Sequence, residues 1–198
     1  MGTIKTTNIE PIADNGTVTL GGSGDTFTVP SGVTVNMSNA TQTGVGGTNT
    51  PAFHATNSAV QDLNSATYTK VAYNTETYDE GGVFNNSTYR FTPGETGKFF
   101  IYYRLGLITS TSAQNKYPYI QFGRLYKNGS ALDFGALLKN SNNDNYNYQE
   151  VYLNASGVVN VTSANDYFEL FAYSTNVAGA ADTDVNTGSY FGAYKIII

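Results

Sequence analysis

The run 99–108, Phe-Phe-Ile-Tyr-Tyr-Arg-Leu-Gly-Leu-Ile, is apolar on both faces of the strand that it predicts. Successive side chains of a strand point to opposite faces, so Phe99 and Ile101 share one face while Phe100 and Tyr102 share the other. A sandwich strand in a lone chain is expected to keep one face in water. We therefore expect other subunits to cover one sheet. The alternative is a loop that covers the second face, which would explain one doubly apolar strand more easily than two. The run 190–197 is a second such strand.

The rest of the chain predicts an all-β protein. No window keeps the 3.6-residue period of a helix, and Thr, Asn and Ser, which favour strands or turns over helix interiors, make up 62 of the 198 residues. Asn128-Gly129 between two apolar runs predicts a two-residue hairpin. We expect ten short strands, which imply a two-sheet sandwich, of which the jelly roll is one form. The ten are 52–56, 68–75, 89–91, 99–108, 117–126, 131–138, 146–153, 158–161, 167–174 and 190–197.

A shift in composition at Pro51 predicts two domains. Phe27 is the only Phe or Tyr before it, so residues 51–198 can build their own core whereas the leader, residues 1–50, cannot. Within the leader, Thr alternates with apolar residues at 17–20, 26–29 and 33–35, which predicts three strands separated by turns at 21–25 and 30–32, and residues 42–50 form a linker. The leader is either an ordered stalk or anchor, covered by other copies or by a docking partner, or a flexible tail.

Charge and cysteine content exclude several function classes. Charged residues are only 13% of the chain and its net charge is -5, so nucleic acid is not an expected partner. The chain has no cysteine, which excludes disulfides, zinc–thiolate sites and thiol nucleophiles. No apolar run approaches the length of a membrane span, and the first residues lack the hydrophobic core of a signal peptide. We expect neither membrane insertion nor export by this route.

One spacing pattern is similar to that of a known family. Its members here are Tyr73, Asp79, Phe84, Phe91, Gly97, Phe99, Ile101 and Tyr103. Their gaps match the signature of the C1q-like globular head, which belongs to the tumour necrosis factor-like jelly rolls; the departures are Tyr73 and Ile101 in place of phenylalanine and Phe99 in place of tyrosine. The resemblance covers residues 51–198. It implies a C1q/TNF-like ten-stranded jelly-roll sandwich, preceded here by an extended, β-rich N-terminal stalk or anchor.

The same resemblance implies an oligomer. Members of the family form compact trimers about a threefold axis through the inner sheet, in agreement with the expectation from the doubly apolar strands. We therefore predict a homotrimer. The candidate residues of its interface are Phe53, His54, Tyr102, Tyr152, Phe191 and Tyr194.

The leader resembles N-terminal segments of structural proteins from marine bacteriophages, through residues 4–11 and 19–32. Together the two resemblances imply a virion structural protein: a homotrimeric decoration or fibre on the capsid or tail, assembled in the host cytoplasm. The leader would dock to a capsid or tail protein, and the head would face outward and contact the host surface. The alternatives are a dedicated receptor- or glycan-binding tail-fibre tip and, second, a polysaccharide-degrading enzyme.

Residues that could carry chemistry are few. His54 is the one histidine of the chain, and we expect it to be packed or hydrogen-bonded rather than catalytic. We predict no catalytic residues, no cofactor and no metal ion. The alternative is a calcium ion, whose candidate ligands are Asp144, Asp182 and Asp184.

A loop rich in Asn, Asp and Tyr, residues 140–148, has the composition of a recognition surface. Its candidate contact residues are Asn142, Asn143, Asp144 and Tyr146. They could contact a host glycan or protein, or form a polar loop without a ligand.

Overall fold

The computed structural model describes residues 9, 17–36, 49–64, 66–109, 118–139, 150–176 and 183–196. The chain divides into two units, Met1–Val45 and Gly46–Ile198, and we call the second unit the head. The functional division at residues 1–50 and 51–198 stays a prediction.

The leader forms turns but no strand over its described residues 17–36. Asp25 N–H donates to the Gly22 carbonyl at 3.1 Å, and Val33 N–H donates to that of Pro30 at 3.2 Å, so both predicted turns are present. The three predicted strands at 17–20, 26–29 and 33–35 are not formed in the single chain, and every residue from 17 to 36 is exposed. The physical reason is that nothing covers their few apolar side chains, such as Phe27, which is 70% exposed.

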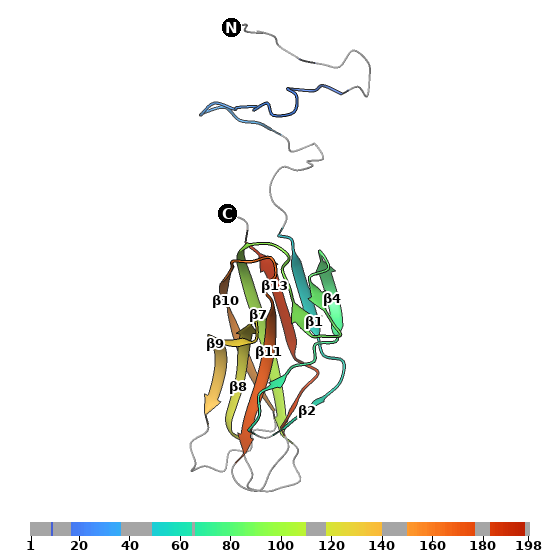
Figure 1. The fold of residues 1–198 in the computed structure, drawn as a ribbon, viewed down its shortest axis with the longest axis vertical. Helices are drawn as coiled ribbons and strands as arrows, with labels where there is room; N and C mark the ends of the chain where they lie inside the picture. Colours follow the sequence, from blue (N-terminus) through green and yellow to red (C-terminus); the bar gives the residue numbers. More distant parts are fainter. Residues whose placement is uncertain are drawn as a thin grey trace. The chain divides into compact units, whose positions relative to one another are not determined.

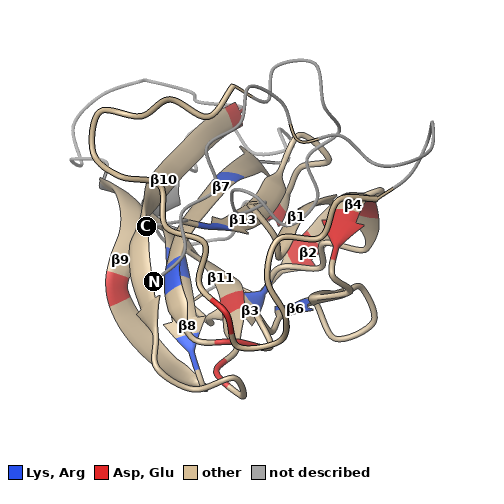
Figure 2. Cartoon of the chain, turned by 90° about the horizontal axis from the view of Figure 1, so that it is seen from above, with Lys and Arg blue, Asp and Glu red and all other residues tan. Residues whose placement is uncertain are grey.

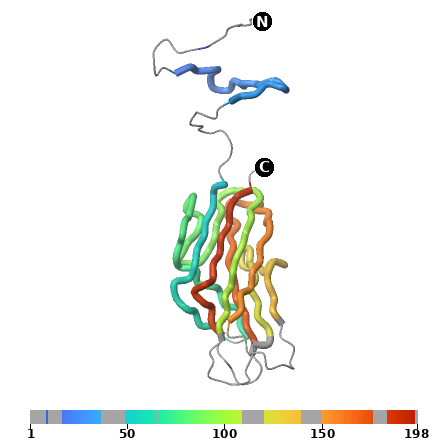
Figure 3. The backbone as a smooth tube through the Cα atoms, turned by 180° about the vertical axis from the view of Figure 1, so that it is seen from behind, coloured from blue at the N-terminus to red at the C-terminus, as the bar shows by residue number. Residues whose placement is uncertain are grey.

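The head is an antiparallel β-sandwich of two sheets (Figure 1). Sheet A runs in the order β2-β12-β7-β13-β1-β4, with β10 paired to the other edge of β7, and Figure 3 shows β1, β13, β7 and β10 side by side. Its strands are β1 (Ala52–Thr56), β2 (Gln61–Leu63), β4 (Thr75–Glu80), β7 (Gly97–Thr109), β10 (Glu150–Val161), β12 (Thr183–Val185) and β13 (Tyr190–Lys195).

Sheet B runs in the order β5-β6-β11-β8-β9, with β3 also paired to β11. Its strands are β3 (Thr69–Lys70), β5 (Phe84–Asn85), β6 (Arg90–Phe91), β8 (Pro118–Lys127), β9 (Ser130–Lys139) and β11 (Phe168–Asn176). The described part of the chain has no helix that is long and apolar enough to cross a membrane. The all-β prediction is confirmed.

The core lies between the sheets and contains a cluster of phenylalanine rings. Phe53 stacks on Phe84 at 4.7 Å between ring centroids, meets Phe91 at 4.8 Å and meets Phe191 edge-on at 5.1 Å. From the spacing signature, Tyr73, Phe84, Phe91, Phe99, Ile101 and Tyr103 all lie in this core. Offset and edge-to-face ring pairs stabilise a core beyond the area that they bury.

The two remaining signature residues shape the backbone. The Asp79 carboxylate accepts hydrogen bonds from the N–H groups of Val83 and Phe84, at 2.9 and 3.1 Å, and so holds the turn after β4. Gly97 begins β7 with φ of 145°, a conformation that favours glycine.

Tyr103 connects β7 to sheet B. Its hydroxyl donates to the Gly123 carbonyl at 2.6 Å and accepts from Ala136 N–H at 2.8 Å, and burial raises its pKa to about 12. The predicted hairpin at Asn128-Gly129 joins β8 to β9, with positive φ at both residues, and is confirmed.

The strands differ from the prediction in several places; β2, β5 and β12, for example, were not predicted. Residues 150–153 and 158–161, from two predicted strands, belong to one strand, β10, because Gly157 leaves room for the Phe134 ring instead of turning the chain; residues 146–149 lie outside the described residues. The predicted strand 68–75 is interrupted at 71–74, where the backbone passes from β3 in sheet B to β4 in sheet A. Strand β4, Thr-Glu-Thr-Tyr-Asp-Glu, was not predicted because a charged edge strand lacks the apolar alternation.

Candidate functional site

An aromatic cluster covers the outer face of sheet A. We call it the sheet A aromatic face: His54, Tyr78, Phe100, Tyr102, Tyr190 and Tyr194, contributed by β1, β4, β7 and β13. The His54 ring lies 5.2 Å from that of Tyr190 and 5.9 Å from that of Tyr102, and Phe100 lies 5.3 Å from Tyr194. Five of the six side chains are half-buried in the single chain, and Tyr78 is 41% exposed.

The register of the strands places His54, Gly192 and Tyr102 side by side at the centre of this face. His54 pairs with Gly192 across β1 and β13, and Gly192 pairs with Tyr102 across β13 and β7. The Tyr102 ring therefore passes over Gly192, and its hydroxyl hydrogen-bonds His54 Nδ1 at 3.0 Å, with the donor set by the histidine tautomer. A Cβ atom at residue 192 would lie 2.4 Å from Tyr102 ring atoms, so glycine is the residue that fits there.

Burial keeps this centre uncharged near neutral pH. Removal from water lowers the pKa of His54 below 6.5. It also raises the pKa of Tyr102 well above 10, with smaller contributions from its hydrogen bond to Tyr78 and from the hydroxyls of Tyr190 and Tyr194. Since the charged form is disfavoured at both groups, the pair acts as a packed hydrogen bond, as the sequence predicts for His54.

A shallow groove of about 390 Å³ opens on the same side of sheet A, beside β10. Aromatic rings form one wall, and Asn154 and Ser156 supply amide and hydroxyl groups on the other. Its lining residues are Phe100, Tyr102, Tyr103, Asn154, Ala155, Ser156 and Tyr190. Among the residues that the structure describes, no carboxylate, lysine or histidine lines it.

A second group lies where β10 meets β7. The Arg104 guanidinium lies 3.6 Å from the centre of the Tyr152 ring, and the Tyr152 hydroxyl donates a hydrogen bond to Glu150, which also accepts one from the Asn186 amide. The hydrogen bond to Glu150 raises the pKa of Tyr152. The ring has room because Gly106 lies beneath it.

The predicted interface residues separate onto two faces. His54, Tyr102 and Tyr194 lie on the sheet A aromatic face, and Tyr152 lies 37% exposed near it. The prediction for Phe53 and Phe191 is wrong, since both are fully buried between the sheets. Alternation explains the error: Phe53 is adjacent to His54 along β1, so the two side chains point to opposite faces.

Gly192, Tyr78, Phe100 and Tyr190 of this site were not among the predicted interface residues. An isolated glycine inside a strand, as in Tyr-Phe-Gly-Ala-Tyr, is a signal for close approach of another group and could have identified Gly192.

Of the calcium candidates, Asp184 lies in β12 opposite Asp62. Asp144 and Asp182 lie outside the described residues, as does the recognition loop with Asn142, Asn143 and Tyr146, so both hypotheses stay predictions. Within the described ranges, no group of three or more His, Asp or Glu side chains is placed to hold a metal ion.

Comparison with known proteins identifies the fold. No family model and no curated protein matches the sequence. Among solved structures, murine APRIL has a TM-score of 0.51 at 11% identity, over 73% of this chain and 98% of that one. Eiger TNF from S. frugiperda has a TM-score of 0.52 at 12% identity, over 74% of this chain and 92% of that one. At such low identity these matches establish a TNF-like jelly-roll fold and nothing finer.

Replacing Gly192 by alanine should displace the Tyr102 ring and break its hydrogen bond to His54. We expect Gly192→Ala to lower the free energy of unfolding by about 1–3 kcal/mol, the usual cost of overpacking. Urea unfolding at one protein concentration measures it. The control is the double variant Gly192→Ala/Tyr102→Ala: if the clash is the cause, the alanine at 192 costs little once the ring is absent. Additive effects of the two changes would contradict this account.

Acidification should destabilise the head through His54. Because its pKa in the folded protein is below the unfolded value of 6.5, the unfolded chain binds the proton more readily between those two values. The free energy of unfolding should therefore fall as the pH drops through this window and stay level above it. Calorimetric melting from about pH 8 to about pH 5 measures this. The His54→Gln variant should show a flatter profile, and an unchanged slope would contradict the assignment.

Proposed function

We propose that the chain is a non-enzymatic structural protein of a bacteriophage virion, assembled as a homotrimer through the sheet A aromatic face. The observation that carries this proposal is the face itself, on which six aromatic rings from four strands are left without a covering layer in the single chain. Contiguous aromatic patches on a soluble domain mark interaction surfaces, and aromatic residues are enriched at the centre of protein interfaces.

A copy of the same chain is the partner that best fits this face. The sheet A groove is lined by aromatic rings and by Asn154 and Ser156, so it offers room for a side chain of another copy. The C1q-like resemblance implies a threefold arrangement through the same sheet. A head-to-tail contact that closes after three copies leaves no unpaired surface for further growth.

The leader is the part of the chain that supports the proposed location on a virion. Its resemblance to N-terminal segments of bacteriophage structural proteins suggests a capsid or tail protein as docking partner. Leu20 and Phe27 are 61% and 70% exposed, so the segment gains order only against another surface. In this arrangement the trimer assembles in the host cytoplasm, the leader attaches to the particle and the heads face outward.

The second candidate function is recognition of the host surface by the head. Such a role needs a binding surface outside the trimer contact. The outer face of sheet B supplies a separate aromatic cluster, which favours this candidate as an addition to the structural role.

The trimer has a direct test in solution. Light scattering should give three times 21.3 kDa, about 64 kDa. The variant Phe100→Ser/Tyr194→Ser removes two adjacent rings from the face and should shift the mass toward 21.3 kDa at micromolar concentration, since each central aromatic contributes about 1–2 kcal/mol or more.

The matched control is Phe122→Ser/Tyr173→Ser. These two rings are also neighbours, 6.4 Å apart, but lie on the outer face of sheet B, so the mass should stay near that of the trimer. A wild-type protein that is monomeric, or a control variant that dissociates as completely as the sheet A variant, would contradict the proposed contact.

Placement on a virion is tested by imaging particles from infected cells with gold-labelled antibodies against residues 51–198. We expect labels at the outer surface of the capsid or tail. Particles that carry no label, with the protein recovered only in the soluble fraction, would contradict the proposal.

A further inference from the structure

The outer face of sheet B carries an aromatic cluster of its own. It consists of Tyr68 beside β3, Phe122 and Tyr126 on β8, and Phe171 and Tyr173 on β11. Ring centroids are 4.7 Å apart for Tyr68 and Tyr173, and 4.3 Å apart for Tyr126 and Phe171. Tyr68 to Tyr126, at 6.2 Å, and Phe122 to Tyr173, at 6.4 Å, join the pairs into one group. We call it the sheet B aromatic cluster.

The ring spacing shows how these side chains pack. The pairs Tyr126–Phe171 and Tyr68–Tyr173 are tilted stacks, with interplanar angles of 40° and 33°. Tyr68 is 37% exposed and the other three side chains are half-buried, so part of each stays accessible to solvent. The edge of an aromatic ring is the positive end of its quadrupole, and a tyrosine hydroxyl can donate a hydrogen bond. Exposed ring edges and hydroxyls thus offer partial positive charge to a ligand.

Arginine 124 lies in the middle of this cluster. Arg124 is on β8 between Phe122 and Tyr126, and it pairs with Phe171 across β11. Its Nε–H donates to the Leu132 carbonyl at 3.0 Å, which leaves the terminal amino groups of the guanidinium without a partner among the described residues. Guanidinium groups in this state bind carboxylate or sulfate oxygens, often through two parallel hydrogen bonds.

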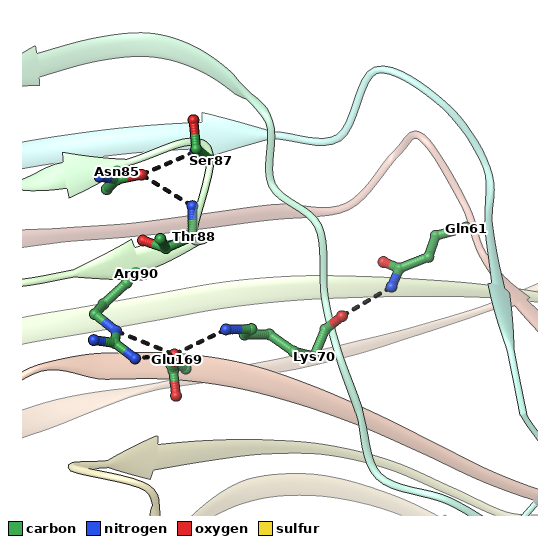
Figure 4. Close-up of polar contacts among 7 residues, drawn as sticks. All are labelled: Gln61, Lys70, Asn85, Ser87, Thr88, Arg90 and Glu169. Atoms are coloured by element: carbon green, nitrogen blue, oxygen red, sulfur yellow. Dashed lines mark hydrogen bonds and ion pairs between the residues drawn. The ribbon is translucent and has the colours of Figure 1, made fainter.

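Two other cations on this face, Lys70 and Arg90, share one carboxylate. Glu169, with a side chain only 6% exposed, accepts from Lys70 at 3.1 Å and from Arg90 at 3.1 and 3.2 Å, as Figure 4 shows. The Arg90 guanidinium also lies 3.7 Å from the centre of the Tyr167 ring. One buried carboxylate thus neutralises only one of two cations, and the surroundings of Arg124 keep an excess of positive charge.

Charge is distributed unevenly over the head. The strands of sheet A carry six acidic residues, three of them, Glu76, Asp79 and Glu80, on β4 alone. On sheet B, by contrast, Lys70, Arg90 and Arg124 face only Glu169 and Asp133, and Figure 2 shows basic residues on β3, β6 and β8. In a chain of net charge -5, this is the face to which an anionic ligand is complementary.

We propose that the outer face of sheet B binds an acidic polysaccharide. A carboxylate or sulfate of the polymer pairs with Arg124, and its hydroxyl and ring oxygens accept hydrogen bonds from Tyr68, Tyr126 and Tyr173. A polysaccharide fits because it combines acidic groups with closely spaced oxygens along an extended chain, as this row of donors requires. The inference deepens the host-recognition part of the proposed function and depends on neither the trimer contact nor the leader.

The experiment is affinity electrophoresis of the full chain in native gels that contain alginate or dextran sulfate, with uncharged dextran as the neutral control. We expect wild-type migration to slow with increasing alginate or dextran sulfate, an effect weakened by salt, and to be unaffected by dextran. Arg124→Gln should weaken the apparent affinity about tenfold, the usual effect of losing a charged hydrogen bond. Phe122→Ser/Tyr173→Ser should weaken it at least as much.

Two matched controls keep the test specific. Phe27→Ser removes an exposed aromatic ring from the leader, and Lys98→Gln removes an exposed cation from the start of β7. Both should bind as the wild type does. Circular dichroism and light scattering of every variant separate a lost site from a lost fold, and Arg124→Gln, a surface change, keeps the test valid if the double variant unfolds.

Four results would overturn the inference. The first is wild-type protein that neither anionic polymer retards, and the second is equal retardation by dextran. The third is unchanged retardation of both sheet B variants. The fourth is a wild-type protein whose mass is a multiple of the trimer mass, while the variant Phe122→Ser/Tyr173→Ser has the mass of one trimer. That result would mean that the outer face of sheet B is a contact between copies. Loss of the trimer with retained polymer binding would instead contradict only the trimer contact.

Discussion

Strand β7 contributes to both faces of sheet A, and strict alternation along it decides what each face becomes. Phe99, Ile101 and Tyr103 enter the core, while Phe100 and Tyr102 remain outside. Because β7 pairs with β10 on one edge and with β12 and β13 on the other, its outer rings are brought beside those of β1, β4 and β13. A shift of one residue in register would exchange the two sets and destroy both the core and the aromatic face.

This constraint also explains which parts of the molecule could be predicted from the sequence. The core side of β7, the hairpin at Asn128-Gly129 and the all-β class follow from local patterns that the structure retains. The passage of residues 71–74 between the sheets could not be predicted, because Val71 and Tyr73 alternate as they would in an ordinary strand. Phe53 and Phe191 were assigned to the interface because they are aromatic. Their positions in the alternation of β1 and β13, which place both side chains in the core, were not considered.

The two outer faces of the sandwich are both aromatic, yet they differ in chemistry. On sheet A, a glycine beneath Tyr102 lets rings lie over a neighbouring strand, and burial keeps His54 and Tyr102 uncharged. On sheet B, tilted ring pairs surround an arginine whose terminal amino groups have no partner among the described side chains. Removing the uncharged sheet A aromatic face from water costs less free energy than removing the charged Arg124 on sheet B. This difference favours a protein contact at sheet A and an oxygen-rich ligand at sheet B.

The central claim is that copies of the chain cover sheet A, and distances between copies measure it most directly. The sequence has no cysteine, so a single spin label can be attached at Asn154→Cys beside the sheet A groove or at Asp133→Cys on β9 of sheet B. Dipolar coupling between labels on different copies should give one defined distance for residue 154 that is shorter than the one for residue 133. No coupling at residue 154, or the reverse order of the two distances, would contradict the account.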